Sequence, residues 1–402
     1  MKVVFAASEA APFCKTGGLA DVAGALPRAL AAAGHEVSLF LPHYRTVRSR
    51  WPGRLAAKLS FPFGAGEGRA DLLCADTDAA VGTAVFFVDC PALFDREGLY
   101  QEGGKDHPDN GERFAFFCRA VIEGAKACAP GAEVFHCHDW QSALIPAFLR
   151  TLHRAEPAAR AATVLTVHNA AYQGLFPRTL LKACGLPEEE FIPERLEYYG
   201  RLNFLKAGLV YAEKINAVSP SYAREVQSSA EFGRGLEGVF RGRRDDLSGI
   251  LNGLDHDAWD PSRDPHLPRR YGARDAAEGK AACRKALLKE CGLSAGRGPL
   301  VAIVSRLDPQ KGLDLALEAL PPLIGRGWRL AVLGQGEDAL ARRLRALALE
   351  NPKSVHFRET FDEPFAHRLY AACDLFLMPS RFEPCGLGQL IAMRYGTIPV
   401  VR

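Results

Sequence analysis

The hydrophobic positions of the chain fall into short β-branched runs that alternate with longer amphipathic stretches rich in Ala and Leu. The short runs predict strands, the long stretches predict helices, and their alternation is typical of βαβ units with parallel sheets. The strands predicted in the first half are residues 2–8, 36–42, 84–89, 134–138, 163–168 and 214–218. The stretch 18–34 predicts the first helix, which Gly34 ends, and Pro27 inside it predicts a kink.

The second half repeats this alternation with a start of its own. Its predicted strands are residues 301–307, 330–333, 355–357, 375–378 and 398–401. Its predicted helices are residues 312–325, 337–350, 363–372 and 386–395. Residues 253–298 between the halves are rich in Asp, Arg, Gly and Pro, which predicts the linker and the entry to the second domain.

We therefore expect an α/β protein with two doubly wound domains, at residues 1–250 and 251–402. In such sheets ligands bind outside the carboxyl ends of the strands. Two sheets that face each other would place that location in one interdomain cleft. The residues that follow the predicted strands are therefore the first candidates for a functional site.

Length and composition agree with two globular domains and exclude several other classes. The chain has 402 residues, against about 150 for a typical domain, and 48% of them are hydrophobic. The 50 Lys and Arg residues exceed the 47 Asp and Glu residues by only three, which argues against a dedicated nucleic-acid binder. No apolar run approaches the ~18 residues of a membrane span, and Ser8 and Glu9 come too early for a signal peptide.

The eleven cysteines are scattered and form no Cys-x-x-Cys pair. Neither a structural zinc site nor a disulfide framework is therefore expected. Free thiols are typical of a reducing compartment, so the expected location is the cytoplasm.

A lysine and two glycines open the first predicted helix. Lys15, Gly17 and Gly18 follow the first strand in the segment Lys-Thr-Gly-Gly. Glycines let the backbone approach a phosphate closely, a helix N-terminus favours an anion, and a lysine adds a positive charge. The order is not that of a Walker A loop. The segment predicts an anion site, with a plain tight turn before a helix as the alternative.

Asp139 and His168 end two further strands of the first half. Polar residues at the ligand-binding edge of a parallel sheet are candidates for a site. The alternative for His168 is a hydrogen-bonded structural histidine. Zinc held by His136, His138 and His168 is disfavoured, because no carboxylate or thiol is placed to complete a closed site.

Charged residues also follow two strands of the second half. Arg306 and Lys311 lie within one βα turn, where two cations would suit a diphosphate leaving group. Glu383 lies between Phe and Pro just before the helix that opens at Gly386, so its carboxylate can bind sugar hydroxyls while the helix N-terminus faces an anion. The alternatives are two solvated loop cations and a helix-capping carboxylate.

The segment that starts at Gly334, Gly-Gln-Gly-Glu-Asp-Ala, formally fits the dinucleotide-binding fingerprint, and the acidic Glu359 follows it. The segment falls at the second βα turn of its domain, whereas the dinucleotide fold places its fingerprint at the first. It supports an alternative interpretation, an NAD-type dehydrogenase, that gives no role to Lys15, Arg306 or Lys311.

Together these segments resemble the bacterial glycogen synthase and plant starch synthase family of retaining glycosyltransferases. The matching segments are Lys-Thr-Gly-Gly-Leu-Ala-Asp-Val (15–22), His-Cys-His-Asp-Trp-Gln (136–141), Thr-Val-His-Asn (166–169), Val-Ser-Pro-Ser-Tyr-Ala-Arg-Glu (218–225), Leu-Asn-Gly-Leu-Asp (251–255), Ser-Arg-Leu…Gln-Lys-Gly (305–312) and Pro-Ser-Arg-Phe-Glu-Pro-Cys-Gly-Leu (379–387). They stand in family order over essentially the whole chain.

The resemblance implies a GT-B architecture, in which two Rossmann-like domains face each other across the active site. It also implies transfer of glucose from ADP-glucose to the non-reducing end of an α-1,4-glucan such as glycogen. The transfer would retain the anomeric configuration and need no metal or other cofactor. Neither a nucleic-acid partner nor a membrane partner is expected.

The resemblance further implies roles for residues at matching positions. In the first domain, Lys15 and the Gly17 and Gly18 amides would contact the donor diphosphate, with Asp21 nearby. His168 would lie beside the reacting sugar, and Asp139 and Asn252 would contact sugar hydroxyls.

In the second domain, Arg306 and Lys311 would neutralise the leaving ADP. Glu383 and the backbone of Cys385, Gly386 and Leu387 would hold the glucosyl hydroxyls and the phosphates. Gly334 and the aromatic Phe361 would lie near the nucleotide, Phe361 beside the adenine.

The sequence contains no pair of carboxylates arranged as in a glycosidase. One hypothesis is that the leaving phosphate accepts the proton of the acceptor hydroxyl, which would explain the lack of an obvious general base. The chain also departs from the family pattern. Ile391 stands where many retaining GT-B enzymes have a second acidic residue, with Gln389 nearby as in the starch and glycogen synthases.

The sequence stops at Arg402, before a further Thr-Gly-Gly turn and a closing helix that the family has. We therefore expect an incomplete version of the family chain. The alternative function is a catalytically silent protein that binds glucan and nucleotide-sugar.

Overall fold

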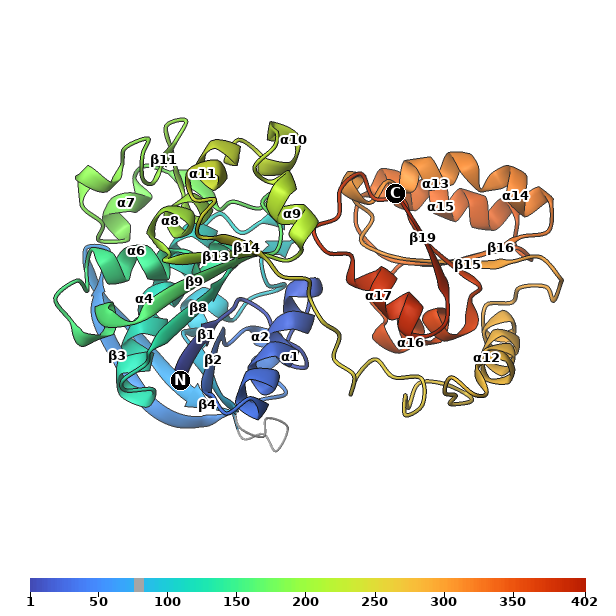
Figure 1. Ribbon diagram of the computed structural model, residues 1–402, viewed down its shortest axis with the longest axis horizontal. Coiled ribbons are helices and arrows are strands. Elements are labelled where there is room, and N and C mark those ends of the chain that lie inside the picture. Colours follow the sequence, from blue (N-terminus) through green and yellow to red (C-terminus); the bar gives the residue numbers. More distant parts are fainter. Residues whose placement is uncertain (76–82) are drawn as a thin grey trace. The chain divides into compact units, whose positions relative to one another are not determined.

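The computed structural model describes residues 1–75 and 83–402 (Figure 1). The chain divides into two compact units, Met1–Gly253 and Leu254–Arg402. The border between them lies three residues after the border expected from the sequence, between residues 250 and 251. Both units are built from a parallel sheet with helices on its faces, which confirms the predicted α/β class.

The first unit is built around a nine-stranded sheet in the order β14-β13-β9-β8-β1-β2-β5-β4-β3. The bounds in that order are Leu247–Gly249, Lys214–Ala217, Ala162–Val167, Val134–His138, Lys2–Ala6, Glu36–Pro42, Thr83–Asp89, Gly66–Cys74 and Arg54–Phe63. The strands from β14 to β5 are parallel, whereas β4 and β3 are antiparallel additions at one edge.

Six of these nine strands correspond to strands predicted from the sequence. The three that were not predicted are β3, β4 and β14. Along β3, Leu59 and Phe61 are buried while Ser60 and Pro62 are exposed. A strand covered on one face alternates in this way and lacks the continuous apolar run that identifies a strand buried on both faces.

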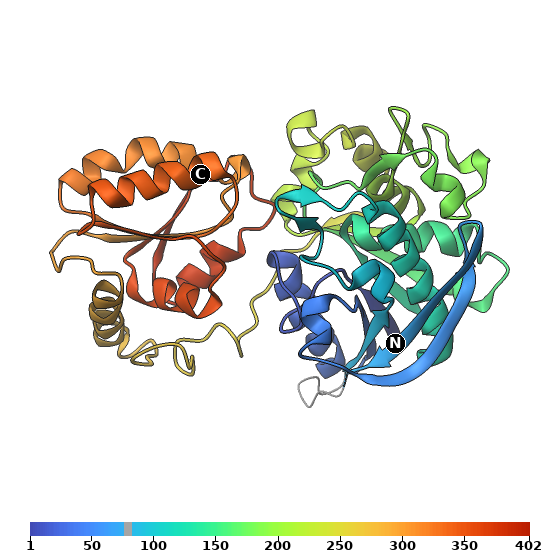
Figure 2. The ribbon, with the colours of Figure 1, turned by 180° about the vertical axis from the view of Figure 1, so that it is seen from behind.

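The helices of the first unit lie on both faces of the sheet. Helix α1 (Gly18–Ala32) packs on β2, and α4 (Asn110–Cys128) packs on β3, β4 and β5. Figures 1 and 2 show these two helices on opposite sides of the sheet. The other helices are α2 (Arg45–Arg48), α3 (Pro91–Phe94), α5 (Asp139–Ser142), α6 (Leu144–Arg150), α7 (Leu180–Ala183), α8 (Phe204–Tyr211), α9 (Pro220–Glu225), α10 (Ala230–Gly233) and α11 (Glu237–Gly242), with 3₁₀ turns at Pro157–Arg160 and Glu188–Glu190.

Two small antiparallel sheets complete the first unit. One is the pair β6 (Gln101–Glu102) and β7 (Lys105–Asp106). The other has the order β10-β12-β11, with bounds Leu175–Pro177, Arg201–Asn203 and Glu197–Tyr198. Neither sheet was predicted, because strands of two or three residues are too short to show an alternation of hydrophobic and polar residues.

The second unit has a five-stranded parallel sheet in the order β17-β16-β15-β18-β19. The bounds in that order are Val355–Arg358, Arg329–Leu333, Leu300–Val304, Leu375–Met378 and Ile398–Val401. Its helices are α12 (Ala276–Glu290), α13 (Leu313–Ala319), α14 (Pro321–Gly325), α15 (Asp338–Glu350), α16 (Glu363–Ala372) and α17 (Leu387–Arg394), with a 3₁₀ turn at Pro309–Lys311.

Side chains of β15 alternate between two cores, one on each face of this sheet. Leu300 and Ala302 join the core that α12 and α16 cover, whereas Val301 and Ile303 join the core that α13 and α15 cover. Figure 1 shows these helix sets on opposite faces. This period of two is what a strand between two helical layers requires.

The second half differs from the sequence prediction in two details. Helix α12, which was not predicted, lies within residues 253–298, at the entry to the second unit, and it buries Cys283 and Leu287. Helix α12 contains many charged residues, so its apolar face could not be recognised from the sequence pattern. The single helix expected at 312–325 is two helices, α13 and α14, and the second begins at Pro321. A proline has no N–H to donate and is favoured at the start of a helix.

Candidate active site

Each parallel sheet has a point where the strand order reverses. In the first unit it lies between β1 and β8, and in the second unit between β15 and β18. In doubly wound sheets ligands bind at this point, outside the carboxyl ends of the strands. The segments that follow these four strands carry most of the residues singled out in the sequence, so each unit has one candidate half-site.

The turn at Lys15 follows β1 and packs around a buried carboxylate, Glu9, which is 4% exposed. Glu9 accepts hydrogen bonds from the Thr16 and Gly17 amides, from the Thr16 hydroxyl at 2.8 Å and from the Tyr100 hydroxyl at 3.1 Å. Burial raises the pKa of Glu9 above its ordinary value, and these bonds oppose the rise. The backbone amides of this turn therefore already donate to a carboxyl group of the chain itself.

Lys15 lies on the same turn and pairs with the first turn of α1. Its Nζ lies 2.7 Å from Oδ1 of Asp21, and the two side chains are 17% and 22% exposed. Gly18 is the first residue of α1, and the N-cap residue is Gly17, which has no side chain to cap the helix. The structure thus brings Lys15, Gly17, Gly18 and Asp21 together at one helix N-terminus.

Asp139 and His168 are joined in a second cluster of the first unit. Asp139 follows β8 with a left-handed φ of 53°, and its Oδ1 accepts from the backbone N–H of His168 at 2.7 Å and of Asn169 at 3.4 Å. Asp is among the residues that tolerate this backbone conformation. Burial raises the pKa of Asp139 to about 7. The same burial lowers the pKa of His168 to about 3, so this imidazole is neutral.

A row of three histidines lies behind this cluster. Nδ1 of His138 lies 3.0 Å from Nε2 of His168, and Nε2 of His136 lies 2.8 Å from the Thr166 hydroxyl. The rings of His136 and His138 are 4.3 Å apart, and Phe5 stacks on His138 at 4.2 Å. Burial lowers the pKa of His136 to about 4 and that of His138 well below its ordinary value. These neutral rings hold His168 in place from the core side.

Asn252 lies far along the sequence from Asp139 and His168. It is half-buried on the segment that follows β14, at the end of the first unit. Within residues 1–75 and 83–402, no hydrogen bond links it to Asp139 or His168.

In the second unit, Lys311 and Glu383 form a direct ion pair. Nζ of Lys311 lies 2.7 Å from Oε2 of Glu383, and the side chains are 17% and 20% exposed. The Ser380 hydroxyl donates to the same oxygen at 2.9 Å. The two turns are also joined through Gln310, whose carbonyl accepts from the Arg381 N–H at 2.8 Å. The loops after β15 and β18 thus form one surface at the switch point.

Close backbone packing explains two glycines at this edge of the sheet. Gly312 has a φ of 63°, and a Cβ there would collide with the carbonyl oxygen of Pro379. A Cβ at Gly334 would collide with the carbonyl oxygen of Ser305. The fingerprint-like glycine is therefore required by turn-to-turn packing, which removes the main support for the dehydrogenase interpretation.

We expect Gly334→Ala to lower the free energy of unfolding by about 1–3 kcal/mol, because the added methyl group overpacks a turn with no free space. Urea unfolding of the full chain, followed by tryptophan fluorescence, measures the change. Gly325→Ala is the control, since a Cβ at Gly325 meets no atom within 4 Å. Equal midpoints for Gly334→Ala and wild type would show that this turn adjusts freely.

The remaining predicted residues of the second unit occupy the same sheet edge. Gly386, with a φ of 80°, precedes α17, which begins at Leu387, and Cys385 is half-buried beside it. Arg306 is exposed in the turn after β15. Phe361 is 54% exposed after β17, two strands away from β15.

Glu9, Tyr100, His138 and Ser380 belong to these half-sites but were not among the predicted site residues, and His138 was considered only as a disfavoured zinc ligand. Glu9 and His138 stand at strand ends, which is a usable signal. Tyr100 lies on an irregular segment far from any motif and could not have been found.

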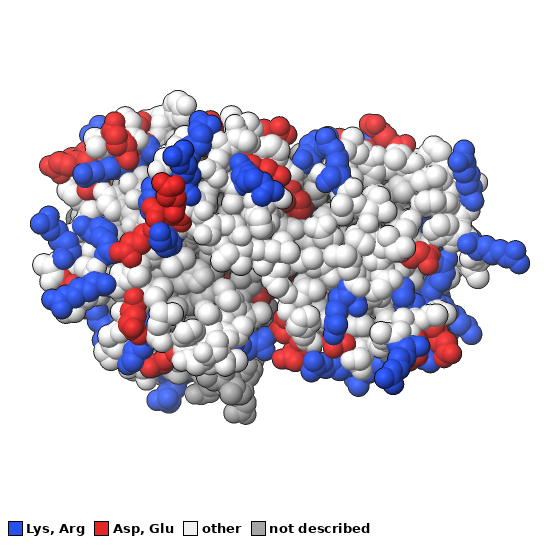
Figure 3. Space-filling model, in the orientation of Figure 1, with Lys and Arg blue, Asp and Glu red and all other residues white. Residues whose placement is uncertain are grey.

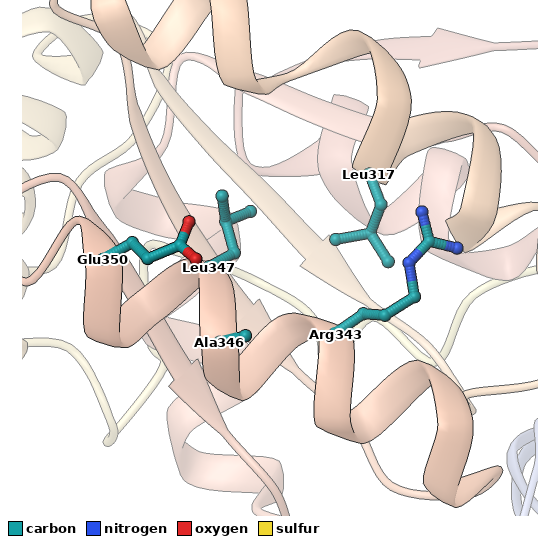
Figure 4. Close-up of a pocket in the computed structure, with 5 residues that line it drawn as sticks. All are labelled: Leu317, Arg343, Ala346, Leu347 and Glu350. Carbon is teal, nitrogen blue, oxygen red and sulfur yellow. The ribbon is translucent and has the colours of Figure 1, made fainter.

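A pocket of about 210 Å³ lies elsewhere on the second unit (Figure 4). Its lining residues come from α13 and α15 and are Leu317, Arg343, Ala346, Leu347 and Glu350. None of the candidate site residues lines it. On the drawn face of each unit, Lys and Arg are interspersed with Asp and Glu (Figure 3). Among the described helices, none has the length and apolar character needed to cross a membrane.

Two Rossmann-like units with polar residues at their switch points, together with the family profiles that match them, identify the chain as a glycosyltransferase of the GT-B class. The family profile of the starch synthase catalytic domain matches residues 2–242, and that of glycosyl transferases group 1 matches residues 288–402. The chain belongs to the glycogen synthase and starch synthase family, which confirms the resemblance drawn from its motifs.

Individual relatives support this membership. The chain is 48% identical to the glycogen synthase of Anaeromyxobacter dehalogenans strain 2CP-C and 46% identical to that of Koribacter versatilis strain Ellin345. Both alignments cover 100% of this chain, with 84% and 82% of the respective relative. The catalytic domain of starch synthase IV from Arabidopsis thaliana, bound to ADP and acarbose, matches with a TM-score of 0.91 and 34% identity, over 100% of this chain and 82% of that one.

Proposed function

We propose that this chain transfers glucose from ADP-glucose to the non-reducing end of an α-1,4-glucan, with retention of configuration. The observation that carries the proposal is the Lys311–Glu383 pair at the switch point of the second unit, 2.7 Å from nitrogen to oxygen. It combines a cation for a leaving phosphate with a carboxylate for sugar hydroxyls. The glycogen synthase relatives and the ADP and acarbose bound to the starch synthase IV structure support the choice of substrates.

The leaving diphosphate is the group that this surface suits best. When the bond from C1 of glucose to the phosphate oxygen breaks, negative charge develops on that oxygen. Lys311, Arg306 and the N-terminus of α17 at Gly386 would stabilise that charge. Lys15 and the amide of Gly18 would add a second set of donors from the first unit, and the Gly17 amide would join them by exchanging its bond to Glu9 for one to the diphosphate.

The glucosyl group would be held by acceptors on both half-sites. Glu383 has one oxygen engaged by Lys311 and Ser380, and an ionised carboxylate has about four lone-pair sites, so it retains capacity for sugar hydroxyls. The backbone of Cys385, Gly386 and Leu387 would assist it. His168 would lie beside the reacting carbon as a neutral group, and Asp139 and Asn252 would accept from hydroxyls. The turn at Gly334 and the exposed ring of Phe361 would lie near the nucleotide.

The proton of the acceptor hydroxyl needs an acceptor of its own. We propose that the departing phosphate oxygen takes it as the new bond from the acceptor oxygen to C1 forms on the same face. ADP then leaves with that proton, and charge and atoms balance. The cations of the chain supply the positive charge that this step needs, so we propose no metal or other cofactor.

The cellular setting proposed is a reducing cytoplasm. The cysteines of the described chain are free thiols, and most of them are buried. ADP-glucose and α-1,4-glucan are the only partners proposed, without nucleic acid or membrane.

A comparison of two donors tests the proposed function. Labelled ADP-glucose and UDP-glucose are each supplied with glycogen, and nucleoside diphosphate release and label incorporation are measured. We expect incorporation from ADP-glucose, with kcat/KM about tenfold or more above that for UDP-glucose. A preference for UDP-glucose would overturn the proposed donor, and incorporation from neither would overturn the activity.

A further inference from the structure

Tyr199 combines unusual exposure with a strained backbone. It is 86% exposed and stands in the two-residue turn between β11 and β12. Its φ is 48°, and that of the following Gly200 is 77°. A hairpin turn with positive φ at both central residues strongly favours Asn-Gly. A bulky residue in that conformation is a genuine outlier, and such strain is typical of functional positions.

The hairpin holds two aromatic rings in a fixed arrangement. The ring of Tyr198 meets that of Tyr199 edge-on, with centroids 4.8 Å apart and planes at 88°. The Tyr198 hydroxyl donates to the carbonyl of Arg234 at 3.0 Å, and the Gly200 N–H donates to Oε1 of Glu197 at 2.6 Å. The exposed ring therefore sits on a supported turn.

The support of this hairpin is shared with the loop that carries His168. The Arg234 carbonyl that accepts from Tyr198 also accepts from Nε2 of Gln173 at 2.9 Å. Oε1 of Gln173 in turn accepts from Nδ2 of Asn203, which ends β12, at 2.7 Å. Between His168 and Gln173 lies Tyr172, whose side chain is 43% exposed. Exposed aromatic rings thus occur both on the active-site loop and on the hairpin bonded to it.

We propose that Tyr198 and Tyr199 form a platform that binds the acceptor glucan at a distance from its reacting end. The inference rests on the proposed function for the identity of the chain that is bound. A glucose ring in an α-1,4-glucan has apolar C–H faces and polar edges, and tyrosine offers an apolar ring with a polar tip. Folding does not require an exposed tyrosine where asparagine is the preferred residue, so the presence of Tyr199 in this turn points to binding.

The test uses Tyr199→Asn, which removes the ring while placing the preferred residue in the turn. We expect KM for glycogen to rise about three- to tenfold, with KM for maltotriose and for ADP-glucose unchanged. The thermal midpoint should stay equal or rise, because the backbone strain is relieved. Tyr199→Trp should keep the glycogen KM of wild type, and Leu349→Asn, at a side chain 80% exposed on α15, should change nothing.

Electrophoresis in gels that contain glycogen gives a readout that does not depend on catalysis. We expect retardation of wild type and weaker retardation of Tyr199→Asn. If wild type transfers no glucose but Tyr199→Asn is still retarded less than wild type, the proposed function is wrong while glucan binding by the platform is supported. If wild type transfers glucose while Tyr199→Asn matches it in mobility and in KM, the platform is overturned. A change in sedimentation of Tyr199→Asn without a change in glycogen binding would also overturn it, in favour of contact between copies.

Discussion

Replacing Lys311 by alanine is expected to lower the turnover number for glucose transfer about a hundred- to thousandfold. This is the usual loss when one group that stabilises developing negative charge is removed. The lysine pairs with Glu383 at the switch point of the second unit, where only 17% of its side chain is exposed. In the proposed reaction its ammonium group faces the diphosphate as ADP departs. Steady-state release of ADP in the presence of glycogen measures the effect.

Removing Lys311 also leaves Glu383, whose side chain is only 20% exposed, without its cation, which destabilises the fold. Turnover is therefore compared at a temperature well below the thermal midpoint of Lys311→Ala, where the variant is folded. Lys285→Ala removes an exposed lysine from α12 of the same unit and should retain full turnover. Unchanged turnover in Lys311→Ala would refute the role of this cation at the leaving group.

Asp139→Asn is expected to make the protein more stable at pH 8 and less active. Burial raises the pKa of the Asp139 carboxyl from 3.8 to about 7, and the negative charge of Glu9 contributes to the rise. The hydrogen bonds from the His168 and Asn169 amides only partly offset this. His168 is neutral and brings no compensating positive charge. The ionised carboxylate is therefore a cost to the folded state.

The sign of the pH dependence follows from this raised pKa. Below about pH 4 the Asp139 carboxyl is protonated in both the folded and the unfolded chain. Wild type and Asp139→Asn should therefore have equal free energies of unfolding there. As the pH rises from about 4 to about 7 the unfolded chain releases its proton first, so wild type loses stability relative to the variant. The difference should level off above pH 7 at no more than about 4 kcal/mol.

Urea unfolding between pH 4 and pH 8 measures this difference. Asp245→Asn is the control, since that side chain is 93% exposed and should show no such trend. The activity of Asp139→Asn should fall about ten- to hundredfold in kcat/KM, because a charged acceptor for a sugar hydroxyl is lost. If Asp139→Asn were less stable than wild type at pH 8, the claim that the ionised Asp139 carboxylate destabilises the folded state would be wrong.

Most of the parallel strands could be predicted from the sequence because they are continuous apolar runs, and the three-residue β14 is the exception. Residues 301–304 form such an unbroken apolar run, whose side chains join two different cores. Strand β3 has only one buried face, so its sequence contains no continuous apolar run. Helix α12 carries many charges, so its apolar positions do not stand out in the sequence. The hairpin at Tyr199 is too short to leave any periodic signal.

The candidate residues could be predicted one by one, but their partners could not. Lys311 and Glu383 both follow predicted strands, yet their ion pair depends on β15 and β18 being neighbours in the sheet. Strand order is a property of the whole fold that no local pattern encodes. The same holds for Glu9, whose contact with Tyr100 crosses 91 positions of the chain.

The location and configuration of newly transferred glucose test the central claim most directly. The chain is incubated with ADP-glucose labelled in the sugar and with glycogen, and the product is digested from its non-reducing ends and analysed by proton NMR. We predict one ADP released for each glucose incorporated, with the label at non-reducing ends in α-1,4 linkage. Binding of both substrates without incorporation, or a new linkage of β configuration, would contradict it.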